Sequence, residues 1–197
     1  MSKDISARQE EIIKVSGKIL MEKGIKGLTI KILAKEMGFS ESAIYRHFES
    51  KEDIIYLLLN TLIESIQKRV SEIIKSDLSA TDKLETIFER QIEYVSENPY
   101  FIIAVLSEDL FFETLKIQEV LLQLFNFKIN MVSKLIEEGK VNNTIRTDIE
   151  TKDLANTVVG SFRFLMLRWR YSQFSFDLTT EGRKTINTIT QLIKIQA

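Results

Sequence analysis

Hydrophobic residues recur along this chain at the spacing of α-helices. In residues 6–23 the apolar positions fall three or four apart and share one helix face: Ile12, Ile13, Gly17, Leu20 and Met21. A stripe from Ile55 to Ile73 predicts a long helix that starts after Ser50. The same spacing predicts helices at residues 81–97, 99–111, 113–139, 151–171 and 180–195. The pattern therefore predicts an all-α fold of about nine helices.

Two of these helices are short and lie between Gly24 and Ser50. Gly24 is a usual helix stop, and Thr29 stands where the N-cap of the next helix belongs. The inward face of that helix is Ile30, Leu33, Ala34 and Met37. Gly38 ends it, and Ser40 caps a third helix with Ala43, Ile44 and Phe48 turned inward. Two short helices around the Gly38–Phe39 link have the geometry of a helix-turn-helix.

Composition agrees with a helical fold and narrows the chemistry. One proline and seven glycines are few for a β-rich protein, and the absence of cysteine excludes disulfides, thiolate metal sites and cysteine nucleophiles. A lone histidine, His47, is a poor metal candidate, so we expect no metal and no cofactor. No apolar run approaches the ~20 residues of a membrane span, and the first residues lack a signal peptide's apolar core. We therefore expect a cytoplasmic protein without a membrane partner.

Charge adds only weak support for a nucleic-acid partner. The net charge of the chain is −1. Residues 1–51 hold ten Lys and Arg against seven Asp and Glu, a net of +3, which leaves −4 for the rest. A local basic surface can bind phosphate on a chain that is acidic overall.

The most informative segment is residues 27–59, GLTIKILAKEMGFSESAIYRHFESKEDIIYLLL. It carries an ordered set of residue types at fixed spacing: Thr29, Ala34, Gly38, Ser40, Tyr45-Arg46-His47-Phe48 and Lys51. This set resembles the DNA-binding region of the TetR family of transcriptional regulators. The resemblance continues in outline through the long fourth helix and the turn Arg146-Thr147-Asp148 before two final helices.

The resemblance implies a DNA-binding domain at residues 1–50 whose third helix enters the major groove. Residues at the start of that helix meet base edges, and Arg46 can contact guanine in a bidentate manner. A carboxylate at Glu41 is repelled by phosphate unless it accepts from cytosine N4. Tyr45, His47 and Lys51 match phosphate-contacting positions, and Thr29 and Lys31 anchor the second helix. The predicted DNA-binding residues are Thr29, Lys31, Ser40, Glu41, Ser42, Ala43, Tyr45, Arg46, His47 and Lys51.

The resemblance also implies that residues 51–197 form a helical domain for ligand binding and dimerisation. Nine of the twelve phenylalanines lie in residues 101–176, where they line a pocket or fill an ordinary core. The candidate ligand-binding residues are Phe101, Phe112, Phe125, Phe162, Met166 and Trp169. Arg163, Arg168 or Arg170 could pair with an acidic ligand group, or lie on a solvated face. For a homodimer through the last two helices, the predicted stripes are Leu154, Val158, Ser161, Leu165 and Arg168, with Ile186, Ile189 and Ile193.

The expected function is thus a ligand-responsive regulator, a repressor that binds a palindromic operator as a homodimer and is released by a small apolar or amphipathic effector. The first alternative is the same fold acting on DNA without a small-molecule effector. An enzyme is disfavoured, because the chain has one histidine, no cysteine, no glycine-rich phosphate loop and no paired-carboxylate motif. A helical protein-interaction module would require the Tyr45, His47 and Lys51 set to be coincidental.

Overall fold

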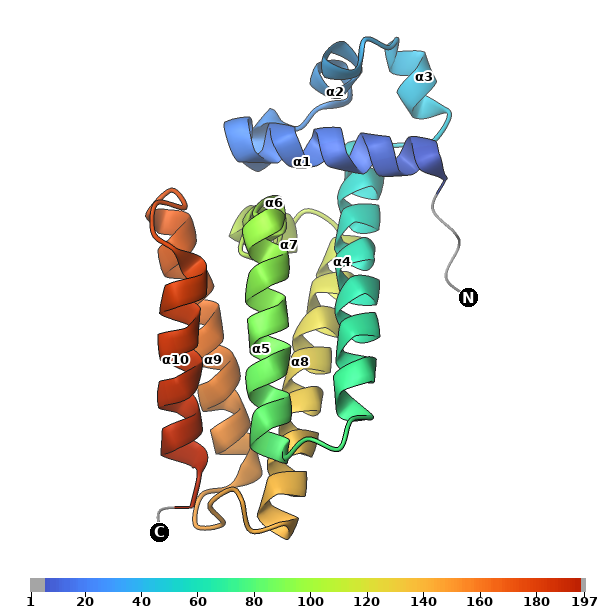
Figure 1. The fold of residues 1–197 in the computed structure, drawn as a ribbon. Coiled ribbons are helices and arrows are strands. Elements are labelled where there is room, and N and C mark those ends of the chain that lie inside the picture. The colour runs from blue at the N-terminus through green and yellow to red at the C-terminus, as the bar shows by residue number, and fades with distance from the viewer. Residues whose placement is uncertain (1–5, 196–197) are drawn as a thin grey trace. The chain divides into compact units, whose positions relative to one another are not determined.

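The computed structural model describes residues 6–195, and the regular elements of that part are ten α-helices (Figure 1). They are α1 (Ala7–Gly27), α2 (Ile30–Met37), α3 (Glu41–Tyr45), α4 (Lys51–Ile74), α5 (Ala80–Glu97), α6 (Tyr100–Val105), α7 (Glu108–Phe111), α8 (Leu115–Val141), α9 (Thr151–Tyr171) and α10 (Leu178–Ile193). The prediction of an all-α fold with three N-terminal helices and a long fourth helix is confirmed.

One predicted helix is wrong in its extent, which raises the count from nine to ten. Residues 99–111 form two helices, α6 and α7, because the backbone leaves helical geometry at Ser107 (φ −86°, ψ 114°). The Ser107 hydroxyl then accepts a hydrogen bond from the Leu110 amide at 3.4 Å and caps the new helix. Serine competes with a continuing helix through this kind of local bond.

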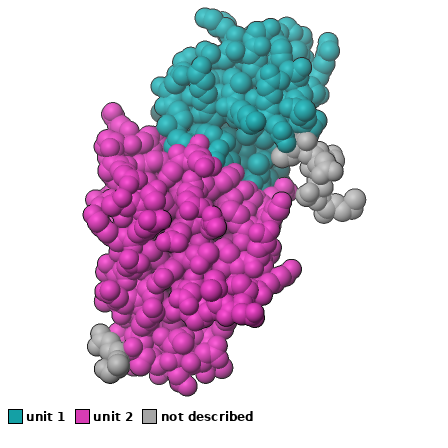
Figure 2. Space-filling model, in the orientation of Figure 1, with its two compact units in different colours: residues 1–63, 98–122 teal, residues 64–97, 123–197 magenta. Residues whose placement is uncertain are grey.

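The chain packs into two compact units (Figure 2). The first holds the residues up to 63 together with 98–122, and the second holds 64–97 together with 123 onward. Helices α4 and α8 contribute residues to both units. The predicted functional boundary at residue 50 stays a prediction, because these units are defined by packing and not by function.

In the first unit, α1 packs on α2 and α6, and α2 packs on α3. The contact of α1 with α6 is close: a Cβ atom on Gly17 would lie 2.8 Å from the Tyr100 ring. The kink of α1 falls at Gly24 (φ 65°, ψ −172°), the residue predicted to end that helix. This unit therefore groups the predicted helix-turn-helix with α6 and α7.

In the second unit, α10 packs on both α5 and α9, which run beside it in Figure 1. The Phe88 and Phe162 rings, from α5 and α9, meet with centroids 4.7 Å apart. Ile92 of α5 reaches the backbone of α10 at Gly182. Among the described residues, no helix combines the length and apolarity that a membrane crossing requires.

Candidate nucleic-acid interface

The turn between α2 and α3 has the backbone geometry of a helix-turn-helix. Gly38 ends α2 in the left-handed region (φ 68°, ψ 28°), which a residue with a Cβ atom adopts only at a cost. The Phe39 amide donates to the Ala34 carbonyl at 2.8 Å and closes the turn. Two predicted caps are confirmed: Thr29 Oγ1 accepts from the Ile32 amide at 3.2 Å, and Ser40 Oγ accepts from the Ala43 amide at 3.3 Å.

Apolar side chains hold the two helices from behind. Leu33 and Ile44 are fully buried, and Phe48 is 5% exposed. A five-residue helix such as α3 is not stable alone, so these contacts fix its orientation. Its other faces are left free for a partner.

The structure gathers the ten predicted DNA-binding residues on one continuous stretch, residues 29–51. Eight of them are exposed: Thr29, Lys31, Ser40, Glu41, Ser42, Tyr45, Arg46 and His47. Ala43 and Lys51 are half-buried. The hydroxyls of Ser40 and Ser42 lie 2.9 Å apart, so Ser40 serves both a cap and its neighbour. The roles of these residues toward DNA stay predictions.

Two contacts of this region were missed by sequence reasoning. Arg8 of α1 lies over the Phe39 ring, 4.7 Å from its centroid, and so covers the turn. Lys51 Nζ lies 2.5 Å from Glu113 Oε1, and this hydrogen bond raises the pKa of Lys51 above its ordinary value. Neither pair has a signal in the sequence, because the partners are far apart along the chain.

The six predicted ligand-binding residues fall into different environments. Phe101, in the first unit, is 1% exposed and packs on Tyr100, whereas Phe112 in the same unit is 80% exposed. In the second unit Phe162, Met166 and Trp169 are buried along α9, and Phe125 of α8 is exposed. Trp169 Nε1 donates to the Phe176 carbonyl at 3.1 Å. The structure brings Phe162 and Met166 onto one buried side of α9, and the ligand role of all six stays a prediction.

Of the residues predicted for the dimer stripes, Ser161 is half-buried and Arg168 is exposed, but all the apolar ones are buried. Leu154, Val158 and Leu165 of α9 are buried in the core of their own unit, as are Ile186, Ile189 and Ile193 of α10. Helical spacing identifies which residues share a face, but two such faces exist and only packing decides which is covered. The exposed apolar residues of these helices are Phe164, Tyr171 and Leu192.

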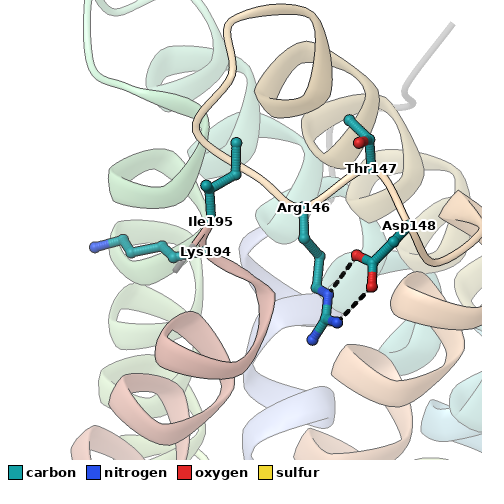
Figure 3. A pocket seen from close by; sticks show the side chains of 5 residues that line it. All are labelled: Arg146, Thr147, Asp148, Lys194 and Ile195. Atoms are coloured by element: carbon teal, nitrogen blue, oxygen red, sulfur yellow. Dashed lines mark hydrogen bonds and ion pairs between the residues drawn. The ribbon is translucent and has the colours of Figure 1, made fainter. Parts of the chain in front are cut away.

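A shallow depression in the second unit is lined by Arg146, Thr147, Asp148, Lys194 and Ile195 and has a volume of about 260 Å³ (Figure 3). Arg146 donates to both carboxylate oxygens of Asp148, Nε at 2.8 Å and Nη2 at 2.6 Å. These bonds hold the pKa of Asp148 below its ordinary value. The Arg146 amide also donates to the Ile193 carbonyl at 2.9 Å, so these residues fasten the end of α10 to the turn after α8.

Two family descriptions match consecutive parts of the chain. Residues 12–56 match bacterial regulatory proteins of the tetR family, and residues 58–193 match the C-terminal region of YsiA-like proteins. The second match alone spans more than half of the chain. The first match contains most of α1, all of α2 and α3 with the turn between them, and the start of α4.

Several relatives and solved structures are similar to this chain over nearly its full length. The nucleoid occlusion factor SlmA of Vibrio vulnificus (strain YJ016) is 25% identical over 175 residues, 88% of this chain and 89% of that protein. The ketosteroid regulator KstR2 of Mycobacterium tuberculosis shares the fold with a TM-score of 0.82 at 15% identity, covering 98% of both chains. FadR of Bacillus subtilis, solved with stearoyl-CoA, gives 0.80 at 19% identity, covering 95% of this chain and 100% of that one. The chain therefore belongs to the tetR family of bacterial regulatory proteins, as a DNA-binding transcriptional regulator and not an enzyme.

Proposed function

We propose that this regulator is a homodimeric repressor that binds a palindromic operator and leaves it when a small apolar or amphipathic effector binds. The observation that carries the proposal is the outer side of α3, where Ser42, Tyr45 and Arg46 are exposed while Ile44 is fully buried. A helix anchored in this way presents its polar side to the major groove. Because the partner is DNA, we place the protein in the cytoplasm.

The DNA contacts divide into two kinds. Arg46 is exposed and has no ion-pair partner among the described residues, so its guanidinium is available for the two acceptors of a guanine. Tyr45, His47 and Lys51 are proposed to contact phosphates, which fixes register without reading sequence. Glu41 stands at the start of α3, where a cytosine amino group is the base donor it can accept from.

We place the dimer contact on the exposed sides of α9 and α10. Phe164 is 61% exposed and Leu192 is 58% exposed, and these two helices pack on each other. Gly160, one turn before Phe164, leaves its surroundings open, with nothing within 4 Å of a Cβ atom built there. Two copies of such a helix pair form a four-helix bundle about a two-fold axis. A palindromic operator has the same two-fold symmetry, so a dimer of this kind matches it.

The dimer contact is tested by Phe164→Glu, with Phe112→Glu as the matched control. Both changes place a carboxylate on an exposed phenylalanine, but Phe112 lies outside the last two helices. In sedimentation velocity we expect Phe164→Glu to shift the protein toward monomer and Phe112→Glu to leave the dimer intact. Equal behaviour of the two variants would contradict the proposed face.

An acidic group on the effector is supported by two cations of the second unit. Lys128 of α8 is half-buried, and burial, followed by the charge of Arg163 on α9, lowers its pKa to about 8. Neither side chain has an acidic partner among the described residues. An anionic head group would supply one, while the phenylalanine-rich helices receive the apolar part. FadR of Bacillus subtilis was solved with such a molecule, stearoyl-CoA, which makes it the first probe to use.

The proposal is tested in two steps. The purified protein is first incubated with a random pool of duplex DNA, and the retained molecules are sequenced through successive rounds. We expect an inverted repeat with half-sites about one helical turn apart, ~34–36 Å. Stearoyl-CoA is then titrated into the complex, with free stearate and free coenzyme A as controls. Release by the amphiphile supports effector control, and retention at saturating probe contradicts it for this class.

A second candidate keeps DNA binding and omits the effector. Curated relatives of 24–26% identity over 86–88% of the chain are nucleoid occlusion factors. The name of these relatives mentions no small molecule, and we carry this over as the alternative in which the chain acts on DNA without an effector. A selected operator that no amphiphile releases is the outcome expected from this candidate.

A further inference from the structure

The start of α4 is joined by two ion pairs to residues 113–116, where the segment after α7 leads into α8, within the first compact unit. We call these four residues the charge clamp: Lys51 with Glu113, and Asp53 with Lys116. Lys116 Nζ also lies 4.3 Å from the centroid of the Tyr56 ring. On α4 a positive residue precedes a negative one, and in residues 113–116 a negative residue precedes a positive one. Sliding one segment past the other would therefore bring like charges together.

The backbone on both sides of the charge clamp is fixed by hydrogen bonds. The Glu113 amide donates to the Leu110 carbonyl at 3.2 Å, and Thr114 Oγ1 accepts from the Ile117 amide at 3.2 Å. On α4 the Asp53 amide donates to Ser50 Oγ at 3.3 Å. Glu113 is therefore presented to Lys51 from an ordered segment. Their side chains are each 28% exposed, so solvent screens this pair less than a fully exposed one.

Lys51 differs in this respect from the other cations of the DNA-binding stretch. Among the described residues, Lys31 and Arg46 carry no ion pair, whereas the Lys51 ammonium is held by Glu113 at 2.5 Å and lies 3.6 Å from Glu52. Neutralising a phosphate needs the same ammonium. A carboxylate and a phosphate cannot both take its full charge, so the two are competitors.

We propose that Glu113 is an internal competitor of DNA phosphate for Lys51, held in place by the Asp53–Lys116 pair. The inference rests on the proposed phosphate contact of Lys51. It assigns to the segment between α7 and α8 a function in setting DNA affinity. Because a phosphate contact carries no sequence information, Glu113 lowers the affinity for every duplex alike. Any movement of Glu113 away from Lys51 raises the affinity for every duplex to the same extent.

The test compares Glu113→Gln with Asp109→Asn. Both remove one negative charge from neighbouring positions, but Asp109 faces Lys26, at 3.8 Å, and not Lys51. Dissociation constants are measured by fluorescence anisotropy for a selected operator and a scrambled duplex between 50 and 200 mM salt. At the lowest salt concentration we expect Glu113→Gln to bind both duplexes roughly three- to tenfold more tightly than the wild type. We also expect the slope of log K against log salt concentration to steepen by about 0.9 per freed lysine. We expect Asp109→Asn to match the wild type.

Two further variants separate this inference from the proposal beneath it. Lys51→Gln is expected to bind more weakly with a shallower salt slope, and Glu113→Gln is expected to give no gain in that background. If the single variant Glu113→Gln binds DNA more weakly than the wild type, or behaves like Asp109→Asn, the proposed role of Glu113 is overturned. The proposed contact of Lys51 with phosphate then still stands. If Lys51→Gln itself changes neither affinity nor slope, the phosphate contact is overturned, and the competitor with it.

Discussion

The helix-turn-helix and the last two helices achieve order by different physical means. Helices α2 and α3 have eight and five residues, too few to persist alone, and their ends are fixed by Thr29, Gly38 and Ser40. Helices α9 and α10 have 21 and 16 residues and are placed by long buried faces that include Phe162 and Ile186. A small change therefore has different consequences in each region. A lost cap or anchor affects α3 as a whole, whereas a long helix distributes the loss over several turns.

The largest effect on stability is expected from removing the buried side chain that anchors α3. Ile44 is fully buried in a five-residue helix. We expect Ile44→Ala to lower the free energy of unfolding by about 2–5 kcal/mol, because it leaves a cavity under the whole helix. Ile44→Val is the matched control, with a loss of about 0.5–1.5 kcal/mol. Urea unfolding followed by circular dichroism measures both, and equal losses would show that α3 does not depend on this anchor.

In the second unit the half-buried charge of Lys128 destabilises a region that is otherwise held by packing. Burial, and then Arg163, lowers the pKa of Lys128 to about 8, so protonation of this residue opposes folding at neutral pH. The unfolded chain binds this proton more tightly, and Lys128 therefore destabilises less as pH rises from about 8 to its ordinary pKa of 10.5.

We expect Lys128→Met to be more stable than the wild type at pH 7, and the difference to shrink toward pH 10. One pKa unit corresponds to about 1.4 kcal/mol, so the full change is at most about 3 kcal/mol. Unfolding titrations of both proteins at four pH values measure it. A difference that is constant with pH would show that Lys128 titrates as an ordinary surface lysine.

Alanine substitutions at two neighbouring positions of α1 are expected to have opposite effects on stability. A Cβ atom on Gly17 would lie 2.8 Å from the Tyr100 ring, so we expect Gly17→Ala to destabilise by about 1–3 kcal/mol through overpacking. The Ser16 hydroxyl is buried and has no hydrogen-bond partner among the described residues. Ser16→Ala removes that unsatisfied group and should stabilise by about 1 kcal/mol. Thermal unfolding of the two variants measures the signs, and stabilisation by Gly17→Ala would contradict the packing of α1 on α6.

The smallest expected effect concerns the cap of α3. Ser40→Ala removes the acceptor of the Ala43 amide and should cost about 1 kcal/mol. Ser42→Ala is the matched control, because among the described residues the Ser42 hydroxyl bonds to Ser40 and caps no backbone amide, and we expect a change within about 0.5 kcal/mol. If the denaturant midpoints of the two variants coincide, the hydrogen bond from the Ala43 amide to Ser40 contributes nothing measurable to stability.

The same division explains what the sequence could predict. Thr29, Gly38 and Ser40 act on backbone groups at most four residues away, so their types and spacing are sufficient to place both short helices. The split between α6 and α7 also has a local cause, the cap at Ser107, but an apolar run around it concealed the signal.

Contacts between distant residues could not be predicted in this way. The pairing of Lys51 with Glu113 joins positions 62 residues apart, and no pattern relates them. Helical spacing found the buried stripes of α9 and α10, but it could not say that these stripes face the subunit's own core and not a second copy. Phe112 and Phe125 were grouped with Phe162 by residue type, and packing then left the first two exposed.

The central claim, that α3 reads base edges, is tested most directly by the ratio of affinities for a selected operator and a scrambled duplex. The ratio is measured by fluorescence anisotropy at one salt concentration for the wild type, Arg46→Ala and Lys51→Gln. We expect Arg46→Ala to lower the ratio by roughly tenfold or more, since a bidentate contact to guanine contributes about 1–3 kcal/mol of discrimination. We expect Lys51→Gln to weaken both complexes and leave the ratio unchanged. An unchanged ratio for Arg46→Ala would contradict the claim that α3 reads sequence through this residue.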